Sequence, residues 1–159
     1  MSISTRLTDY LDRHGADYEI CEHEASHTSA ETARSAHVPP GQLAKAVLLE
    51  DDSGCMLAVV PSDKSVMLGQ LSEMLGRRRL HLCDEERIAS MFDDCAPGAM
   101  PPVGMAWGVE TIVDDELDDN DVVYLEGGDH QSLLRMSAEE FRDLMSPALH
   151  GHFCRARMH

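Results

Sequence analysis

The sequence is poor in positive charge. It has 13 Lys and Arg residues against 29 Asp and Glu residues, which gives a formal net charge of −16. A chain this acidic is a poor candidate for tight, non-specific binding to a nucleic-acid backbone, because that mode depends on many cationic contacts to phosphate. A small basic patch on an acidic surface stays compatible with the composition, as do a high-salt setting and a basic partner.

The sequence also lacks long apolar runs and paired cysteines. No segment approaches the roughly 18 consecutive apolar residues of a membrane span, and the segment from Met1 to Arg6 leads straight into an amphipathic pattern, unlike a secretory signal. The cysteines are odd in number and widely spaced, and no CxxC motif occurs among Cys21, Cys55, Cys83, Cys95 and Cys154. This spacing indicates reduced thiols in a cytoplasmic protein, without a disulfide framework or a zinc knuckle. We therefore expect no metal, no cofactor and no membrane partner.

Short apolar segments between turn signals make up most of the chain. With 159 residues, 43% of them apolar, the length suits one domain with a full-sized core. The periodicity predicts helices over residues 4–14, 28–36, 66–75, 84–92 and 137–145, and strands over 18–21, 43–49, 55–60, 78–83, 109–113, 122–125 and 130–136. This order favours a single α+β domain with a mixed, largely antiparallel and barrel-like sheet surrounded by helices. Residues 150–159 lack periodicity, so we expect a domain over 1–149 and a loose C-terminal tail.

One stretch matches a zinc-hydrolase motif. His23-Glu-Ala-Ser-His27 has the H-E-x-x-H spacing, which binds zinc when both histidines lie one turn apart on one helix face. Here the match lies between a strand ending near Cys21 and a helix beginning near Thr28. The pattern therefore favours a strand-to-helix loop, and a zinc hydrolase at His23 and His27 is the weaker alternative.

A loop rich in proline and glycine runs from Cys95 to Gly104. Three prolines and two glycines in ten residues exclude a regular helix or a central strand. Its remaining amides, such as those of Gly98, Ala99 and Met100, can point outward and hold a small polar or anionic group. Taken alone, the segment also fits an ordinary connector, which is the more common use of such composition.

Lys45 is the second unusual feature. It lies inside the apolar run from Leu43 to Leu49, so its side chain starts within a sheet. The charged end of a lysine there needs a polar environment. It can reach solvent through its long side chain, pair with an acidic residue or bind an anionic ligand. Solvent is the simplest of these. An ammonium group facing a loop of backbone amides would instead form a phosphate or carboxylate site.

These features together resemble the YbaK family, free-standing relatives of the editing domain of bacterial prolyl-tRNA synthetase. The resemblance rests on Lys45 in Leu-Ala-Lys-Ala-Val, on the G-x-x-x-P-x-G pattern from Gly98 to Gly104, and on the glycine-rich turn from Gly128 to His130. It extends over about residues 3–146 and includes His23 and the helix from Thr28. It implies the α/β editing-domain fold and hydrolysis of mischarged aminoacyl-tRNA.

The resemblance also implies roles for individual residues. Lys45 would hold the phosphate at the 3′-terminal adenosine, the loop from Gly98 to Pro102 would seat the ester, and His130 would be a pocket histidine. We expect these three parts to line one cleft. Further substrate-binding candidates are Ala99, Met100, Gly104, Gly128, His23 and Thr28. Ala46 stands where some members have Asn, Thr or Ser, so the residues leave the edited amino acid open.

We therefore expect a trans-editing aminoacyl-tRNA deacylase that acts on a small amino acid, with tRNA(Pro) as the first candidate and prolyl-tRNA synthetase as a possible partner. An aminoacyl ester is already activated, so positioning, a held water and amide donors can supply the acceleration. A non-catalytic tRNA- or synthetase-binding module of the same fold is the alternative. The basic run Arg77-Arg78-Arg79 fits equally a solvated strand entry and a patch for the acceptor stem.

Overall fold

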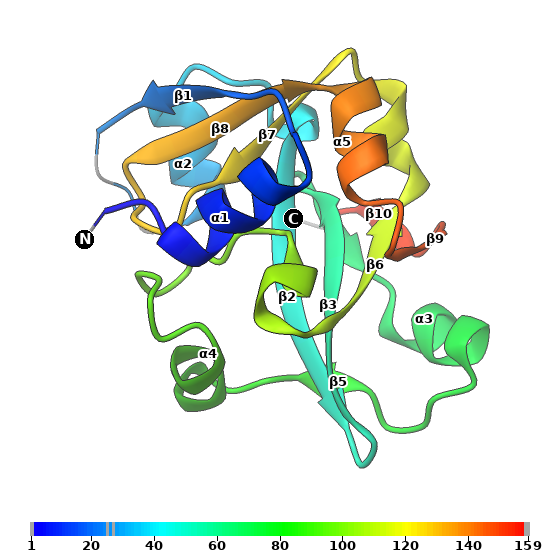
Figure 1. Cartoon of the computed structure of the whole chain (residues 1–159). Coiled ribbons are helices and arrows are strands. Elements are labelled where there is room, and N and C mark those ends of the chain that lie inside the picture. Colours follow the sequence, from blue (N-terminus) through cyan, green and yellow to red (C-terminus); the bar gives the residue numbers. More distant parts are fainter. Residues whose placement is uncertain (1, 25, 27, 158–159) are drawn as a thin grey trace.

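The computed structural model describes residues 2–24, 26 and 28–157 (Figure 1). One large sheet has the strand order β1-β8-β7-β2-β3-β6-β9, with β5 paired to β2, and β4 and β10 form a separate pair. The strands are β1 (Glu19–Glu22), β2 (Leu43–Asp51), β3 (Gly54–Pro61), β4 (Lys64–Val66), β5 (His81–Leu82), β6 (Glu110–Asp114), β7 (Val122–Glu126), β8 (Ser132–Ser137), β9 (Leu149–Gly151) and β10 (Cys154–Ala156). The α-helices are α1 (Thr5–Arg13), α2 (Ser29–Ser35), α3 (Leu68–Leu75), α4 (Glu85–Met91) and α5 (Ala138–Leu144). Short 3₁₀ segments are η1 (Pro40–Gln42), η2 (Gly104–Trp107) and η3 (Asp115–Asp119).

The β2–β3 hairpin is the centre of the sheet. Two apolar runs flank a polar turn, and the antiparallel register places Leu48 opposite Leu57. The far end of the hairpin extends away from the upper part of the sheet, between α4 and α3 (Figure 1). Arg77 pins this end, because its guanidinium donates to Asp51 at 2.6 and 2.8 Å and to the Gly54 carbonyl oxygen at 2.9 Å.

The sheet contains both parallel and antiparallel pairs. β2 runs parallel to β7, and β6 runs parallel to both β3 and β9, whereas the hairpin partners are antiparallel. The expected α+β domain with a mixed sheet is therefore confirmed. Among the described residues, no helix combines the length and the apolar character that a membrane crossing would need.

Alternation along β2 and β3 divides the core between the two sheet faces. Ala44 and Leu57 belong to a large cluster that includes buried residues of α1, α5 and the proline-rich loop, among them Met100 and Val103. Leu49 and Met56 point the other way, into a smaller cluster around Leu71 of α3 and Phe153. Since successive strand residues face opposite sides, Lys45 leaves β2 on the face opposite Ala44.

Residues 150–159 were expected to form a loose tail, and this expectation is wrong for the part that the structure describes. β9 pairs with β6, and β10 pairs with β4. Phe153 between them is fully buried, and its N–H donates to Asp114 at 2.8 Å. Each of these strands has only three residues, so no periodic pattern in the sequence can reveal it. Burial of the Phe153 ring between them holds both strands in place.

Two predicted strands have different bounds in the structure. The strand expected over 78–83 is reduced to His81–Leu82, because Arg79 adopts a left-handed φ of 61°. The strand expected to begin at His130 begins at Ser132. His130 has a left-handed φ of 60°, and the Asp129 carboxylate accepts from the N–H groups of Gln131 and Ser132, which forms a turn before the strand.

Candidate active site

The proline-rich loop contains a tight turn at residues 96–99. The Ala99 N–H donates to the Ala96 carbonyl oxygen at 3.0 Å, with Pro97 and Gly98 between them. Gly98 has φ of 80°, and proline followed by a glycine with positive φ is the signature of a type II turn. The Ala99 amide is thus used inside the turn, which corrects the expectation that it points outward. The amides of Gly98 and Met100 have no hydrogen-bond acceptor among the described residues.

His130 holds this turn. Its Nε2 makes a very short contact with the Pro97 carbonyl oxygen, and the side chain is 5% exposed. In a type II turn the central peptide is oriented with its carbonyl and its N–H on opposite sides, so the Gly98 N–H points away from His130. His130 therefore contacts the loop backbone, as a positioning residue would.

Two glycines allow the chain to approach itself closely around the loop. The Gly128 carbonyl oxygen accepts from the Ala96 N–H at 2.7 Å, and a Cβ at Gly128 would lie 3.3 Å from Cys95 Sγ. A Cβ at Gly104 would overlap the Thr111 hydroxyl. Both glycines are buried, so they shape the loop from beneath rather than face a ligand. Pro102 is buried as well.

The loop and α4 border a cavity of about 400 Å³. Its lining is largely apolar and includes Ile88 of α4, Phe92 directly after that helix, and Pro97, Gly98 and Met100 of the loop. Ala99 is fully buried, whereas Met100 is 9% exposed. The cavity is large enough for a small side chain and offers the Gly98 backbone to a ligand.

Lys45 lies in a second place. Its ammonium donates to the Lys64 carbonyl oxygen at 3.0 Å. Burial, helped by the nearby charge of Arg157 and partly opposed by Asp63, lowers the pKa of Lys45 to about 8. The neighbouring hollow of about 410 Å³ is lined by Arg34 and Lys64, besides Ala30, Pro40, Ser62, Asp63, Ala156 and Arg157. Four cations therefore gather here, although the whole chain has only 13.

The structure joins His130 to the loop but places the Lys45 ammonium elsewhere. Lys45 leaves β2 on the face opposite the one on which Met100 packs. The shared cleft stays a prediction. The pairing along one edge of β2 is interrupted beside Lys45. On this edge β7 pairs with β2 only at Leu43 and Ala44, and β5 pairs with it only at Leu49 and Glu50. Residues 45–47 have no described strand partner on that edge, which leaves an interval in the sheet beside Lys45.

Glu126 borders this interval, and sequence reasoning missed it. It follows Leu125, the partner of Ala44, and is 2% exposed. No hydrogen bond reaches either carboxylate oxygen among the described residues. The pKa of Glu126 is raised to about 7, mainly by burial and in smaller part by the charge of Asp129, while Thr32 partly opposes the shift. The Thr32 hydroxyl itself pairs with Ser26 at 2.6 Å. The only available signal was a charged residue at the end of an apolar strand.

The remaining predicted residues have local roles. Thr28 caps α2 by accepting from the Glu31 N–H at 3.1 Å. The His23 N–H donates to Gln131 at 2.8 Å, and its Nδ1 lies 2.7 Å from the Glu24 carbonyl oxygen. His23 precedes α2 and is not helical, whereas the zinc-hydrolase motif needs a helix. His27, the other half of that motif, lies outside the described residues.

Two cysteines and one carboxylate also meet at the far end of the hairpin, in a group formed by Glu50, Cys55 and Cys83. Burial raises the pKa of Cys83 to about 12, with further contributions from Cys55 and Glu50. Burial likewise raises the pKa of Cys95, beside the loop, to about 12. A thiol with a raised pKa is a poor nucleophile at neutral pH, so Cys95 is suited to packing.

Comparison with solved structures reveals the same fold in several proteins. A proposed trans-editing enzyme for prolyl-tRNA synthetase aligns with a TM-score of 0.82 at 23% identity, over 98% of this chain and 100% of its own. A hypothetical protein aligns with a TM-score of 0.83 at 21% identity, over 94% and 99%. A proposed signal transduction protein from Marinobacter aquaeolei VT8 aligns with a TM-score of 0.77 at 24% identity, over 96% of this chain and 31% of its own.

No protein with a curated description matches the chain significantly. The profile of one protein family does, and it spans residues 23–144, from the residue after β1 to the last residue of α5. This range includes Lys45, the turn at 96–99 and His130. The chain therefore belongs to the aminoacyl-tRNA editing domain family.

Proposed function

We propose that this protein is a trans-editing deacylase that hydrolyses the ester of mischarged aminoacyl-tRNA, acting in the cytoplasm and alongside prolyl-tRNA synthetase. The observation that carries the proposal is the turn at 96–99, held by His130 within a chain of the editing family. The turn leaves the Gly98 and Met100 amides available, and backbone amides are suitable donors to a developing oxyanion.

The cations around Lys45 supply the complementary half of the site. Arg34, Lys64 and Arg157 line the hollow beside the Lys45 ammonium. In an otherwise acidic protein this local group can bind the phosphates of the tRNA acceptor end, and the remaining surface limits binding elsewhere. On binding, the ammonium exchanges the Lys64 carbonyl oxygen for a phosphate oxygen. We propose that the substrate reaches from this hollow to the loop through the interval at residues 45–47 of β2.

This division of labour needs no side-chain nucleophile. The ester is activated before it arrives, so the protein has to position it, donate to its oxyanion and admit one water. The 2′- or 3′-hydroxyl of the terminal ribose, which the substrate brings, can orient that water. Lys45 acts as a binding residue and His130 as a positioning residue in this scheme.

The cavity beside the loop favours a small amino acid. Met100 and Phe92 close it on the apolar side, and the Gly98 backbone closes it at the turn. We propose alanine as the preferred residue, with serine and cysteine next, and rejection of proline. A missing methylene changes affinity by only about 1–3 kcal/mol, so a steric filter excludes larger residues better than smaller ones.

A deacylation panel tests the proposal. Purified protein is mixed with Ala-, Ser-, Cys- and Pro-tRNA(Pro), and the loss of ester is followed over time. We expect Ala-tRNA(Pro) to be cleaved and Pro-tRNA(Pro) to survive. Binding of these tRNAs without turnover of any would instead identify a non-catalytic module of the same fold.

Lys45→Ala is the informative variant in this assay. Loss of a charged hydrogen bond to phosphate, worth roughly 1.5–3 kcal/mol, should lower kcat/KM about ten- to a hundredfold. Lys45→Arg should restore part of it. Arg142→Ala on α5 is the matched control, because it removes one exposed positive charge that does not line this hollow. Equal activity of the two alanine variants and the parent would refute the role of Lys45.

A further inference from the structure

Three chain segments that are distant in sequence bring potential metal ligands together at the far end of the β2–β3 hairpin. Glu50 is the register partner of Cys55 on β3 and of His81 on β5. Residues opposite one another share a sheet face, as do residues two apart. Cys83, two residues after His81, therefore faces the same side, and its position is fixed by the bond from its N–H to the Leu48 carbonyl oxygen at 3.0 Å.

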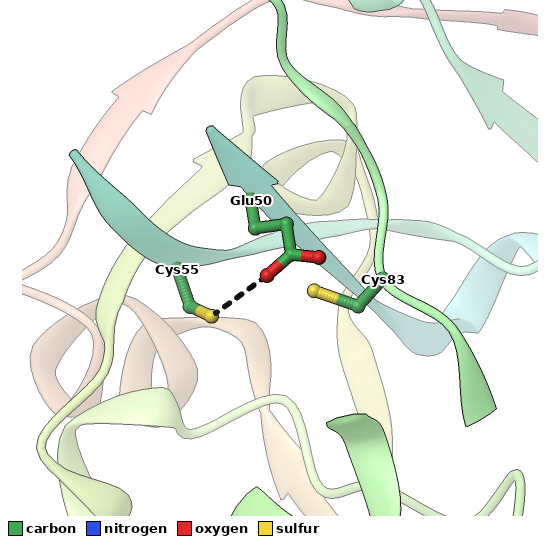
Figure 2. A group of neighbouring side chains, drawn as sticks. All are labelled: Glu50, Cys55 and Cys83. Carbon is green, nitrogen blue, oxygen red and sulfur yellow. Dashed lines mark hydrogen bonds between the residues drawn. The ribbon is translucent and has the colours of Figure 1, made fainter. Parts of the chain in front are cut away.

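The side chains converge on one point. One ligand atom each from Glu50, Cys55 and Cys83 lies within 4.8 Å of the others. Figure 2 shows the Glu50 carboxylate between the two thiols, with Cys55 Sγ 3.9 Å from Glu50 Oε2. Zinc–ligand bonds of about 2.0–2.3 Å place the ligands of a tetrahedral site roughly 3.3–3.8 Å apart, so a small contraction is enough.

His81 lies beside the Glu50 carboxylate, outside the three atoms that already converge, and a shift of its ring would make it a fourth ligand. Its Nε2 lies 3.5 Å from Glu50 Oε1, and its Nδ1 lies 2.9 Å from the Arg79 carbonyl oxygen. An imidazole that donates from one nitrogen to a backbone carbonyl presents the lone pair of the other, which is the usual support of a metal-binding histidine. The left-handed conformation of Arg79 directs that carbonyl.

A second group, Asp114, His152 and Cys154, has a different explanation. The Asp114 carboxylate accepts from the Phe153 N–H at 2.8 Å and from the Glu116 N–H at 2.9 Å. Those bonds hold the C-terminal strands and use the oxygens that a cation would need. The Glu50 carboxylate, in contrast, accepts from no backbone amide among the described residues, and its partners are side chains.

We propose that Glu50, Cys55, His81 and Cys83 form a structural site for a thiophilic divalent cation of the zinc class. Two sulfurs, one imidazole and one carboxylate are a donor set that favours zinc over magnesium or calcium. Binding converts both thiols to thiolates and releases their protons to solvent. This proposal departs from the expectation, based on cysteine spacing, that the chain binds no metal.

Arg87 of α4 occupies the approach to this site. Its Nη2 lies 3.6 Å from Cys55 Sγ, and its Nε lies 3.6 Å from Glu50 Oε2. The guanidinium supplies positive charge to the group in the absence of metal and has to leave when the cation binds. The side chain is half-exposed, so solvent is available to it.

The site would stabilise the segment that leads into the editing loop. Cys83 directly precedes Asp84, which caps α4 by accepting from the Arg87 N–H at 2.8 Å. α4 in turn lines the cavity beside Gly98. A cation linking Cys83 to the hairpin thus fixes the start of α4. This inference is independent of the proposed deacylase activity.

The test uses the full chain, purified under reducing conditions and freed of metal with a chelator. Zn²⁺ is added in a competition titration with a chromogenic chelator, and Co²⁺ is added separately to detect cobalt–thiolate absorption. We expect one equivalent of Zn²⁺ per chain, cobalt–thiolate bands, and a higher Tm with zinc, because a ligand of the folded state stabilises it.

Matched variants assign the ligands. Cys55→Ser and Cys83→Ser should each weaken zinc binding by at least about tenfold. Cys21→Ser, at a partly buried cysteine outside the group, should leave it unchanged. Arg87→Ala should tighten binding, whereas a purely structural ion pair predicts no gain. Failure of the reduced parent to bind zinc, or equal binding by Cys55→Ser and the parent, would overturn the proposal.

Discussion

Glu126 should make the stability of this protein depend on pH in a way that one substitution removes. Its carboxyl group is buried at the end of β7 without a hydrogen bond among the described residues, and burial raises its pKa from 4.5 to about 7. Between these two values the unfolded chain ionises while the folded chain keeps the proton. The stability present below the unfolded-state pKa is therefore lost as pH rises through the folded-state pKa.

The shift sets the magnitude. Each pKa unit corresponds to about 1.4 kcal/mol. Above pH 7 the ionised Glu126 therefore lowers the free energy of unfolding by roughly 3 kcal/mol relative to low pH. Part of it is already present at about pH 5, which leaves a change of about 2 kcal/mol between about pH 5 and pH 8. Glu126→Gln keeps the shape of the protonated acid and cannot ionise. The free energy of unfolding of this variant, relative to the parent, should rise by that amount over this interval.

Urea unfolding at the two pH values measures the effect for parent and variant. Glu73→Gln on the exposed face of α3 is the matched control, because it removes one negative charge from the same acidic chain without a buried carboxyl. A parent-to-variant difference that stays constant from about pH 5 to pH 8 would refute the reasoning. A carboxyl that lowers stability at neutral pH is typical of a functional site, and Glu126 borders the interval beside Lys45.

Three further outcomes follow from the geometry. Burial lowers the pKa of Lys45 to about 8, so its charge is lost as pH rises through that value. The kcat/KM for an edited tRNA should therefore fall above about pH 8, and Lys45→Arg should make kcat/KM less dependent on pH. Gly104→Ala, which would place a methyl group on Thr111 Oγ1, should destabilise the fold by about 1–3 kcal/mol in urea unfolding, and an unchanged midpoint would contradict the close approach. Phe153→Ala should cost about 3–5 kcal/mol by the same measurement, whereas a loose tail would make it neutral.

The sequence alone determined most of the local structure, because helices and hairpins depend on neighbouring residues. Ser4, Thr28, Asp84 and Ser137 each cap a helix where their spacing predicts it, by accepting from a backbone amide. The β2–β3 hairpin follows from two apolar runs around a polar turn. The α+β class follows from the order of these elements, and the family follows from motifs that stand within short stretches.

Tertiary structure decided what depends on distant pairing. The parallel contact of β2 with β7 brings Glu126 to the level of Lys45, across some eighty residues of chain that carry no local sign of it. Strand alternation makes Lys45 leave β2 on the face opposite the one on which Met100 packs, so a site shared by both motifs depends on the interval at residues 45–47. The physical reason is that the sequence of a strand determines which residues lie on each of its faces. Which strands pair with it depends on how apolar residues from the whole chain are buried together.

The cysteines illustrate the same difference. Cys55 and Cys83 are separated by a helix and two turns, so spacing predicts unrelated thiols. The register of β3, β2 and β5 places them on one face, beside Glu50 and His81. Sequence determined which donors the chain has, and only the pairing of three strands determined which of them meet.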